Sequence, residues 1–432
     1  MAHPPQQLCA DLPSLDFKLV IEIVGLPRAL RATLEERWGR PSQEEVGSAA
    51  GSAPHVLCLT AAPGPVGLPS SELVAAELTW FSATRAELRT NGAELSLELT
   101  GGTGDGGPGD GGTGDGDGGL RAEGRIDAER PRGAVEAVVR AVTTLALAQR
   151  DVLLLHAAAV HHAGEALVLL GASGAGKTTS ARRLGREGLR RLADDLIAID
   201  LGVSPPALHR LPFERAGRAL PGTEGEGVAC RGGALVQKGA AVARMGSHAD
   251  PVRAWAEAVI ALPPAPGGAP RLLEAVERLC QLPLGVLEAP AAGPLGPAVI
   301  AWFTALRARD GAAAIPLDSR TAGSQAGPGQ IMAERGQERR IERAPNVAWR
   351  VLDGAAVLVA PSSPAIQTLN EVGTLVWQLA DGRGLGEIVD AVVNEFDVER
   401  TQASADVESF VQALEGRGLL ISRPAPAAGN VR

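Results

Sequence analysis

The chain of 432 residues contains no tyrosine, and aromatic residues make up only 3% of it. Alanine and glycine are abundant throughout, so we interpret the scarcity of aromatics as a compositional bias without functional meaning. None of the four cysteines forms a C-x-x-C pair or has a histidine at metal-ligand spacing; they are Cys9, Cys58, Cys230 and Cys280. This pattern argues against a zinc site and indicates reduced thiols.

The sequence also lacks the features of a secretory or membrane-spanning segment. Its first residues are polar and proline-rich, with no apolar core behind them. The longest apolar stretch, Val152 to Leu170, is interrupted by histidines and a glutamate, so it cannot cross a bilayer. The net charge is −9, and no block of lysine and arginine stands apart from the rest. We therefore expect a cytoplasmic protein with neither a membrane nor a nucleic acid as its partner.

A phosphate-loop motif is the strongest positive feature of the sequence. The run LLGASGAGKTT fits the pattern G-x-x-x-x-G-K-[ST] and follows a short apolar strand. Glycines let successive backbone N–H groups converge on phosphate oxygens at the start of a helix. Lys177 is expected to hold the β/γ-phosphates and Thr178 to bind Mg²⁺. The residues predicted to bind ATP are Gly171, Ala172, Ser173, Gly174, Ala175, Gly176, Lys177, Thr178 and Thr179.

Candidate acid–base residues flank this loop. Asp194 and Asp195 interrupt an apolar strand that follows the helix after the loop. One carboxylate could bind Mg²⁺ opposite Thr178 and the other accept a proton, although such a pair is also typical of a solvated strand end. His156 ends the strand that precedes the loop, where it is either a site residue or a core histidine. A metal site that His156 shares with the histidines at positions 161 and 162 is a further alternative.

The order of these features resembles the catalytic core of the HPr kinase/phosphorylase family. The resemblance covers LLLHAAAVHHAGEALVLLGASGAGKTTSARRLGREGLRRLADDLIAID, residues 153–200. It implies a nucleotide-binding domain like that of phosphoenolpyruvate carboxykinase, unlike that of ordinary phosphate-loop ATPases. It also implies that His156 sits at the transferred phosphate, with Lys177 and Thr178 serving the phosphates and Mg²⁺. Asp194 would be the base toward a Ser or Thr hydroxyl, and Asp195 part of the metal site.

The chain departs from this family farther along. The family's acidic residue followed by R-G-x-G is represented only by CRGGALV, residues 230–236, where Cys230 takes the acidic position and the glycine spacing differs. The departure argues against a second metal contact and against the reverse phosphorylase reaction. It therefore favours a related kinase with another substrate. Members of the family are often hexameric, so a homo-oligomer is a further expectation.

Strand-like and helical patterns divide the rest of the chain into regions. Residues 1–132 are predicted to be strand-rich, with strands at 17–24, 56–60, 78–81, 95–100 and 120–126 and a helix at 28–38. Residues 101–119, GGTGDGGPGDGGTGDGDGG, lack the large apolar residue of calcium-binding repeats, so a flexible hairpin insertion is favoured over such a repeat. The predicted α/β nucleotide-binding domain spans 133–308, with helices at 133–149, 271–282 and 297–307. A linker is predicted at 309–340.

Residues 341–423 are predicted to form a small winged-helix-like α+β domain, followed by a tail at 424–432. Two short strands, 347–351 and 356–360, flank the hairpin signal Asp353-Gly354, and three amphipathic helices follow. The segment resembles the PqqD family through L-N before the first helix, L-x-D-G between helices and D-V-x-x-F in the third helix. That family binds the leader segment of a ribosomally made precursor peptide at a sheet edge and along the third helix. The residues implied here are Ala365, Ile366, Gln367, Thr368, Leu369, Val407, Phe410 and Val411.

Together these features predict an ATP-dependent serine/threonine kinase that phosphorylates a ribosomally synthesised peptide recruited by its own C-terminal domain. A linker of this length would hold the peptide near the catalytic site at a high effective concentration. A peptide maturase is a second expected partner. Two alternatives are a nucleotide-binding peptide chaperone without transfer activity and a regulatory HPr-type serine kinase. The latter is weakened because the N-terminal domain of that family is not recognisable here.

Overall fold

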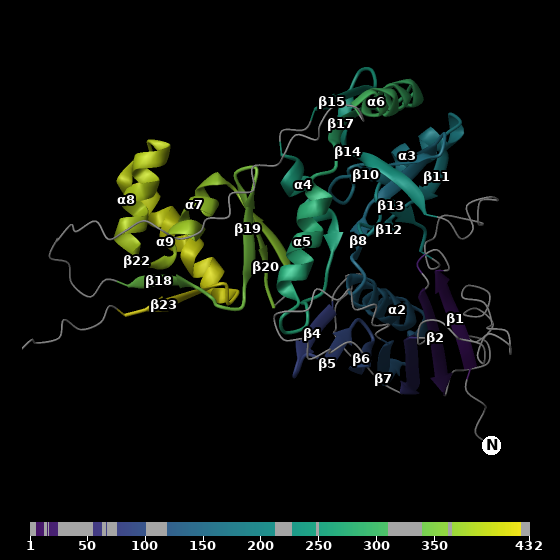
Figure 1. The fold of residues 1–432 in the computed structure, drawn as a ribbon, viewed down its shortest axis with the longest axis horizontal. Helices are drawn as coiled ribbons and strands as arrows, with labels where there is room; N and C mark the ends of the chain where they lie inside the picture. Colours follow the sequence, from purple (N-terminus) through teal and green to yellow (C-terminus); the bar gives the residue numbers. More distant parts are fainter. Residues whose placement is uncertain are drawn as a thin grey trace, which may run out of the picture.

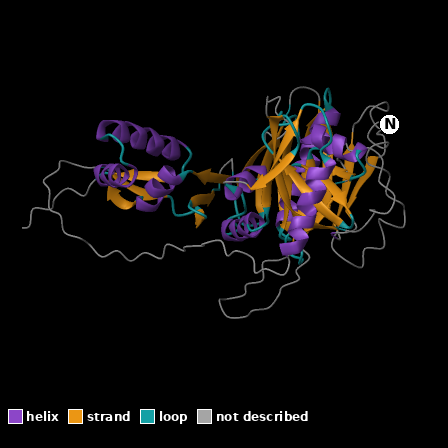
Figure 2. Ribbon diagram, turned by 90° about the horizontal axis from the view of Figure 1, so that it is seen from above, coloured by secondary structure: helices purple, strands orange, loops and turns teal. Residues whose placement is uncertain are grey.

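The computed structural model describes residues 6–12, 15, 17–24, 55–62, 66, 76–100, 119–211, 227–247, 250–309, 339–361 and 365–424. These residues form a mixed α/β protein with eight helices and several sheets (Figure 1). An N-terminal sheet adjoins a larger central sheet with helices around it, and the C-terminal helices form a smaller body at the far end (Figures 1 and 2). No helix in the described part of the chain has the length and apolarity needed to span a membrane.

The N-terminal sheet has seven strands, and the helix α2 (Pro131–Ala148) packs on it. Its strand order is β1 (Gln6–Leu12), β2 (Phe17–Val24), β3 (His55–Ala62), β7 (Gly119–Asp127), β6 (Ala93–Thr100), β5 (Arg85–Thr90) and β4 (Ala76–Trp80). Alternate residues of β5 are buried, which leaves too few apolar positions for the sequence to reveal that strand. All five strands expected between residues 17 and 126 are confirmed, as β2, β3, β4, β6 and β7.

A hairpin joins β6 to β7, as the sequence predicts. Thr100 pairs with Gly119 at the end where the chain passes from β6 to β7, so the Gly/Asp-rich insertion connects two antiparallel strands. Residues 101–118 of the insertion lie outside the described residues, as does the helix predicted at 28–38.

The central sheet carries the phosphate-loop motif. Its strands run in the order β11 (Arg190–Ala193), β9 (Ala158–His162), β10 (Glu165–Leu170), β14 (Val228–Ala240), β13 (Ala207–His209), β12 (Leu196–Asp200), β8 (Val152–His156) and β16 (Val259–Ile260). The strand β17 (Leu284–Pro290) pairs with β14 and with β15 (Arg244–Ser247). The strands β10, β14 and β17 run parallel to one another, so their carboxyl ends meet at one edge of the sheet.

Helices cover both faces of this sheet. On one face α3 (Lys177–Arg186) and α6 (Gly296–Arg309) pack on Leu167 and Leu169 of β10. On the other, α4 (Pro251–Ala258) and α5 (Ala269–Cys280) belong to the core that includes Ala166, Val168 and Leu170. Burial on both faces explains why β10 is a continuous apolar run in the sequence. The predicted helices corresponding to α2, α5 and α6 are confirmed, whereas α4 was missed.

The C-terminal part contains two small sheets and three helices. One sheet has the order β19 (Ala348–Leu352), β20 (Ala355–Val359) and β21 (Ile366–Leu369), and the other β22 (Asp381–Gly384), β18 (Arg340–Arg343) and β23 (Leu420–Arg423). The helices are α7 (Glu371–Leu379), α8 (Leu385–Phe396) and α9 (Arg400–Gly416). Asn370 caps α7 by accepting a hydrogen bond from the Gly373 N–H at 2.9 Å. The three predicted helices and the hairpin at Asp353-Gly354 are confirmed.

The sheet β19–β20–β21 lies between the C-terminal helices and the central domain. Val357 and Val359 of β20 pack in the same core as α4 and α5, whereas Ala356 and Leu358 face the core of the C-terminal helices. An ion pair between Arg350 of β19 and Glu277 of α5 joins the two parts. The C-terminal domain is therefore packed against the central domain and is not held by a linker alone. Alternating side chains of the strand AAVLV bury both of its faces, which accounts for this arrangement.

Candidate functional site

The phosphate-loop residues form a turn between β10 and α3. Gly171, Gly174 and Gly176 have φ angles of 139°, 79° and 104°. A Cβ at Gly171 would lie only 2.9 Å from the Cβ of Ala175, so this position needs a glycine for both its conformation and its space. Gly176 caps α3 without a side chain, and no acidic residue lies in the first turn of the helix. The arrangement suits an anion at the positive end of the helix dipole.

Lys177 begins α3 with its ammonium group folded over the loop. Its Nζ donates hydrogen bonds to the carbonyl oxygens of Gly171 at 2.6 Å and of Ala172 at 3.3 Å. The residue is only 6% exposed. Burial lowers the pKa of Lys177 below its ordinary value, and the negative charge of Asp195 opposes this shift. A buried ammonium gains stability from an anionic partner, which phosphate oxygens would supply.

A second lysine reaches the same loop from the neighbouring strand. Lys238, near the end of β14, donates a hydrogen bond from Nζ to the carbonyl oxygen of Gly174 at 2.5 Å. A Cβ at Gly176 would lie 3.2 Å from the Cε of this lysine. The sequence motif does not include this residue. The composition of the chain could have drawn attention to Lys238, because only three of the 41 basic residues are lysines.

His156 and Asp195 lie together beside Lys177. His156 is the last residue of β8 and pairs with Leu196 at the start of β12. This pairing brings the Nδ1 of His156 to 3.7 Å from the Oδ1 of Asp195. Burial lowers the pKa of His156, the charge of Lys177 lowers it further, and that of Asp195 opposes both. Three of the predicted site residues are thus within electrostatic reach of one another.

The carboxylate of Asp194 is turned in another direction. It forms ion pairs with Arg182 at 3.6 Å and Arg191 at 3.3 Å, and the residue is only 7% exposed. Its backbone carbonyl oxygen accepts a hydrogen bond from the Thr178 hydroxyl at 2.9 Å. Successive side chains of an extended segment point to opposite sides, and the turn between β11 and β12 does not cancel this. The structure therefore places Asp195 beside Lys177 and His156. The carboxylate of Asp194, the predicted base, is instead engaged by two arginines.

The residues around the loop could bind Mg²⁺ only if phosphate oxygens supplied some of its ligands. In the described part of the chain, no cluster of three or more histidine, cysteine, aspartate or glutamate side chains is placed to hold a metal ion. Mg²⁺ needs only one or two protein ligands when phosphate oxygens and water complete its shell, and Thr178 and Asp195 fit that requirement. The three-histidine alternative finds no support. His161 accepts a hydrogen bond from the Gly164 N–H, and His162 packs against the Phe303 ring.

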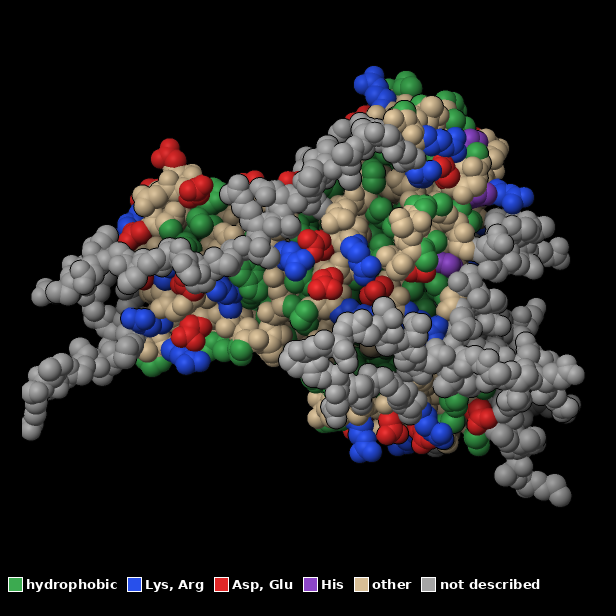
Figure 3. All heavy atoms as spheres, in the orientation of Figure 1, with side chains coloured by type: hydrophobic (Ala, Val, Ile, Leu, Met, Phe, Trp, Pro, Cys, Tyr) green, Lys and Arg blue, Asp and Glu red, His purple; other side chains and the backbone are tan. Residues whose placement is uncertain are grey.

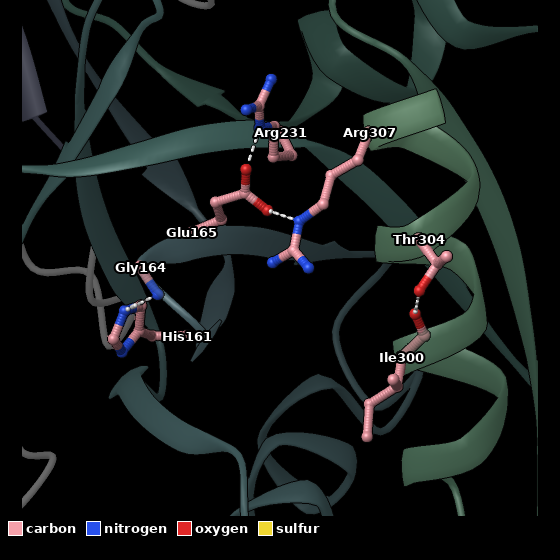
Figure 4. Close-up of polar contacts among 7 residues, drawn as sticks. All are labelled: His161, Gly164, Glu165, Arg231, Ile300, Thr304 and Arg307. Atoms are coloured by element: carbon pink, nitrogen blue, oxygen red, sulfur yellow. Dashed lines mark hydrogen bonds and ion pairs between the residues drawn. The ribbon is translucent and has the colours of Figure 1, made fainter. Parts of the chain in front are cut away.

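The segment CRGGALV forms the first half of β14 and has a structural role there. Cys230 is buried, and burial raises the pKa of its thiol to about 12, which favours the neutral form. Arg231 donates a hydrogen bond to Glu165 at 2.6 Å, and Arg307 of α6 donates another at 2.6 Å (Figure 4). Glu165 begins β10 and the phosphate loop follows its last residue. This cluster therefore lies at the opposite end of the strand from the loop.

The predicted peptide-binding residues lie on an edge strand and on the helix next to it. The strand β21 pairs only with β20, so its other edge carries no strand among the described residues. The side chains of Val407 and Val411 on α9 are buried in the domain core, whereas Phe410 is partly exposed. Arg417, at the end of α9, donates a hydrogen bond to the Gln367 side chain at 3.0 Å and so links the helix to the edge strand. The two valines could support a peptide site only from beneath.

Charged side chains on α9 and its neighbours are paired within the domain. Arg339 contacts both Glu408 and Glu415 of α9, which fixes the helix against the strands β18 and β23. On the face of the molecule in Figure 3, basic and acidic side chains of the described residues are interspersed, with no extended basic patch.

Comparison with known proteins identifies the C-terminal segment. Residues 355–420 match the model of the family described as Coenzyme PQQ synthesis protein D (PqqD). The match begins at β20, includes β21 and all three C-terminal helices, and confirms the resemblance of this segment to PqqD. The resemblance of residues 153–200 to HPr kinase stays a prediction.

A solved structure is also similar to part of the chain. It is described as "TbiB1 in Complex with the TbiA(beta) Leader Peptide" and has 27% sequence identity, with a TM-score of 0.17. The similarity covers 20% of this chain and 99% of that chain. A TM-score of this size supports no conclusion about the present chain. No curated protein matches the sequence.

Proposed function

We propose that this protein is an ATP-dependent kinase that phosphorylates a Ser or Thr hydroxyl of a ribosomally synthesised peptide. The C-terminal PqqD-like domain would recruit the peptide. One observation carries the proposal. A phosphate loop whose Lys177 lies beside Asp195 and His156 occurs in the same chain as a PqqD-like segment, which packs on helices of the same domain.

The loop residues fit a nucleoside triphosphate. Gly171, Gly174 and Gly176 adopt the positive φ angles that glycine favours, and the space beside Gly174 is open, because a Cβ there would meet no atom within 4 Å. Lys177 supplies a buried positive charge, and Thr178 and Asp195 would hold Mg²⁺. When bound, Mg²⁺ would neutralise part of the negative charge of the phosphates.

In the transfer step, the hydroxyl oxygen of the peptide forms a bond to the γ-phosphorus, while the bond from that phosphorus to the β–γ bridging oxygen breaks and ADP leaves. The imidazole of His156 accepts the hydroxyl proton, and Asp195 stabilises the resulting positive charge across the 3.7 Å contact. Lys177 stabilises the charge on the transferring group. Asp194, engaged by two arginines, holds the turn that presents Asp195.

The C-terminal domain would bind the leader segment of the peptide as an additional strand on β21, with main-chain hydrogen bonds supplying affinity. The packing of β20 on α4 and α5 supports a fixed geometry between this edge and the phosphate loop. The rest of the peptide would then reach the loop without the entropic cost of ordering a mobile domain. A peptide maturase would act on the phosphorylated product.

The test is to incubate the full chain with ATP, Mg²⁺ and the precursor peptide encoded beside it, and to measure phosphate incorporation by mass spectrometry. We expect one added phosphate on a Ser or Thr. Transfer should fall at least about 100-fold in Lys177→Ala and in Asp195→Asn. Asp194→Asn is the matched control, because it makes the same chemical change in the adjacent residue. If it abolishes transfer while Asp195→Asn does not, the sequence-based assignment of Asp194 as the base is correct and ours is wrong.

A nucleotide-binding peptide chaperone is the second candidate, and the buried thiol of Cys230 favours it. The kinase family that residues 153–200 resemble carries an acidic residue at that position, which this chain replaces with a neutral side chain. If ATP and the peptide both bind but no phosphate is transferred, the kinase proposal fails and the chaperone is the better description.

A further inference from the structure

The chain uses arginine almost everywhere that it needs a positive charge. Of its 41 basic residues only three are lysines, namely Lys18, Lys177 and Lys238. Lys18 lies in the N-terminal strand β2, and the other two donate hydrogen bonds to the same phosphate loop. A lysine ammonium is a compact point charge on a flexible stem, whereas a guanidinium is a wide planar group. Retention of lysine at two contacts with one loop points to a ligand that requires compact cations there.

Strand pairing places Lys238 beside the loop and near the N-terminus of α3. The strand β14 runs parallel to β10, with Leu235 in register with Leu170, and continues past the point where β10 ends. It therefore extends along the loop. The carbonyl oxygen of Val236 lies 3.4 Å from the position of a Cβ on Gly171, and the stem of Lys238 passes over Gly176. Ligands of open α/β sheets bind at the carboxyl ends of parallel strands, which is where this lysine lies.

The ammonium of Lys238 is available to a ligand. The residue is exposed, and none of the ion pairs found among the described residues involves it. Its contact with Gly174 is to a neutral carbonyl oxygen. That hydrogen bond has a charged donor only, whereas an anionic oxygen would add the attraction between opposite charges. A phosphate oxygen in the loop would thus be a better acceptor than the carbonyl, and rotation within the lysine stem suffices to reach it.

We infer that Lys238 is a second phosphate-binding residue, which contacts the triphosphate of ATP from β14 while Lys177 contacts it from α3. This inference rests on the proposed function for the identity of the ligand. It does not depend on phosphoryl transfer, because a chaperone that binds ATP would use the same contact. Two compact cations, one from α3 and one from β14, would then share the negative charge of the triphosphate. Without Lys238, one lysine and the helix terminus would have to hold that charge alone.

Isothermal titration calorimetry of the full chain with ATP and with inorganic tripolyphosphate tests the inference. Lys238→Met keeps the apolar stem and removes the charge. We expect both ligands to bind about 10- to 100-fold more weakly to this variant, with a shallower dependence of affinity on salt concentration. Arg253→Met is the matched control, since Arg253 pairs with Glu257 on α4 and is expected to leave both affinities unchanged.

Two results would overturn the inference. The first is unchanged affinity of Lys238→Met for both ligands. The second is weaker binding whose salt dependence is unchanged, together with a lower melting temperature of the variant without ligand. That result would mean that Lys238 only stabilises the conformation of the loop. Failure of the wild-type chain to bind either ligand would remove both this inference and the proposed function. Binding without phosphate transfer would remove only the kinase proposal.

Discussion

Truncation of Val357 and Val359 to alanine should loosen the C-terminal domain from the central domain without unfolding it. Both valines are fully buried and face the core that contains α4 and α5. The residue between them, Leu358, is equally buried but faces the opposite core. The strand β20 thus offers a variant pair that acts on one interface and a control that acts on the other.

The expected cost follows from the volume removed. Each Val→Ala change deletes two carbon atoms, or about 1.6 kcal/mol at about 0.8 kcal/mol per buried methylene, and the remaining cavity adds to this. The two sites are close enough to share a cavity, so their effects are not strictly additive. We estimate a loss of about 4 kcal/mol for the pair. This is a large part of the total stability of about 5–15 kcal/mol that is typical of a folded protein.

Hydrogen exchange of the full chain, followed by mass spectrometry, is the assay. In the double variant the amides of α4 and α5 should exchange faster, while those of α8 and α9 keep most of their protection. In Leu358→Ala the order should reverse, with the C-terminal helices losing protection first. Unchanged exchange of α4 and α5 in the double variant would refute the conclusion that β20 packs on them as an energetically significant interface.

Two further predictions concern Glu165 and the buried thiols. Burial alone would raise the pKa of Glu165, but hydrogen bonds from Arg307 and Arg231 hold it below the ordinary value of 4.5. Its stabilising contribution is therefore complete above pH 4.5 and is lost as the pH falls through the lower folded pKa. Glu165→Gln should lower the free energy of unfolding by about 1–2 kcal/mol at pH 7 in urea titrations, since Arg307 is partly exposed. The difference from wild type should shrink below pH 4.5; a constant difference would contradict this cause. Burial raises the pKa of both Cys230 and Cys280 to about 12, so at pH 8 only about one molecule in 10⁴ carries either thiolate. Iodoacetamide should label them only after unfolding, as read by peptide mapping, and labelling of the native chain at the denatured rate would show the burial to be wrong.

The elements that the sequence predicted well are those with a strong apolar period. The strand β10 and the helices α5, α7, α8 and α9 each carry enough apolar residues at the right spacing to be recognised. The strands β18 and β22 are short and polar, RIER and DGRG, so their existence depends on partners distant in the sequence. For the same reason a single-sequence pattern could not reveal them.

The candidate site was predictable in its members but not in its geometry. The motif identified the loop and Lys177, and the spacing identified the Asp-Asp pair. Which of the two carboxylates faces Lys177 depends on the conformation of the turn between β11 and β12. No local sequence pattern predicts that conformation. Lys238 comes to the loop only because β14 pairs in parallel with β10. The position of a side chain that a neighbouring strand contributes is a property of the sheet, which explains why the motif did not include it.

Under the proposed function, the two-sided burial of β20 limits how this protein can be re-engineered toward other peptides. A foreign PqqD-like domain grafted in place of residues 341–423 would have to present small aliphatic side chains toward α4 and α5 as well as its own core. The side chains that the grafted domain presents toward α4 and α5 would matter as much for a working chimera as the residues proposed to select the peptide. Ile366 of β21 packs against the same core, so substitutions in that strand also affect the interface. Substitutions confined to the exposed side of α9 leave the interface intact, and under the proposed function they are the more direct route to a new peptide specificity.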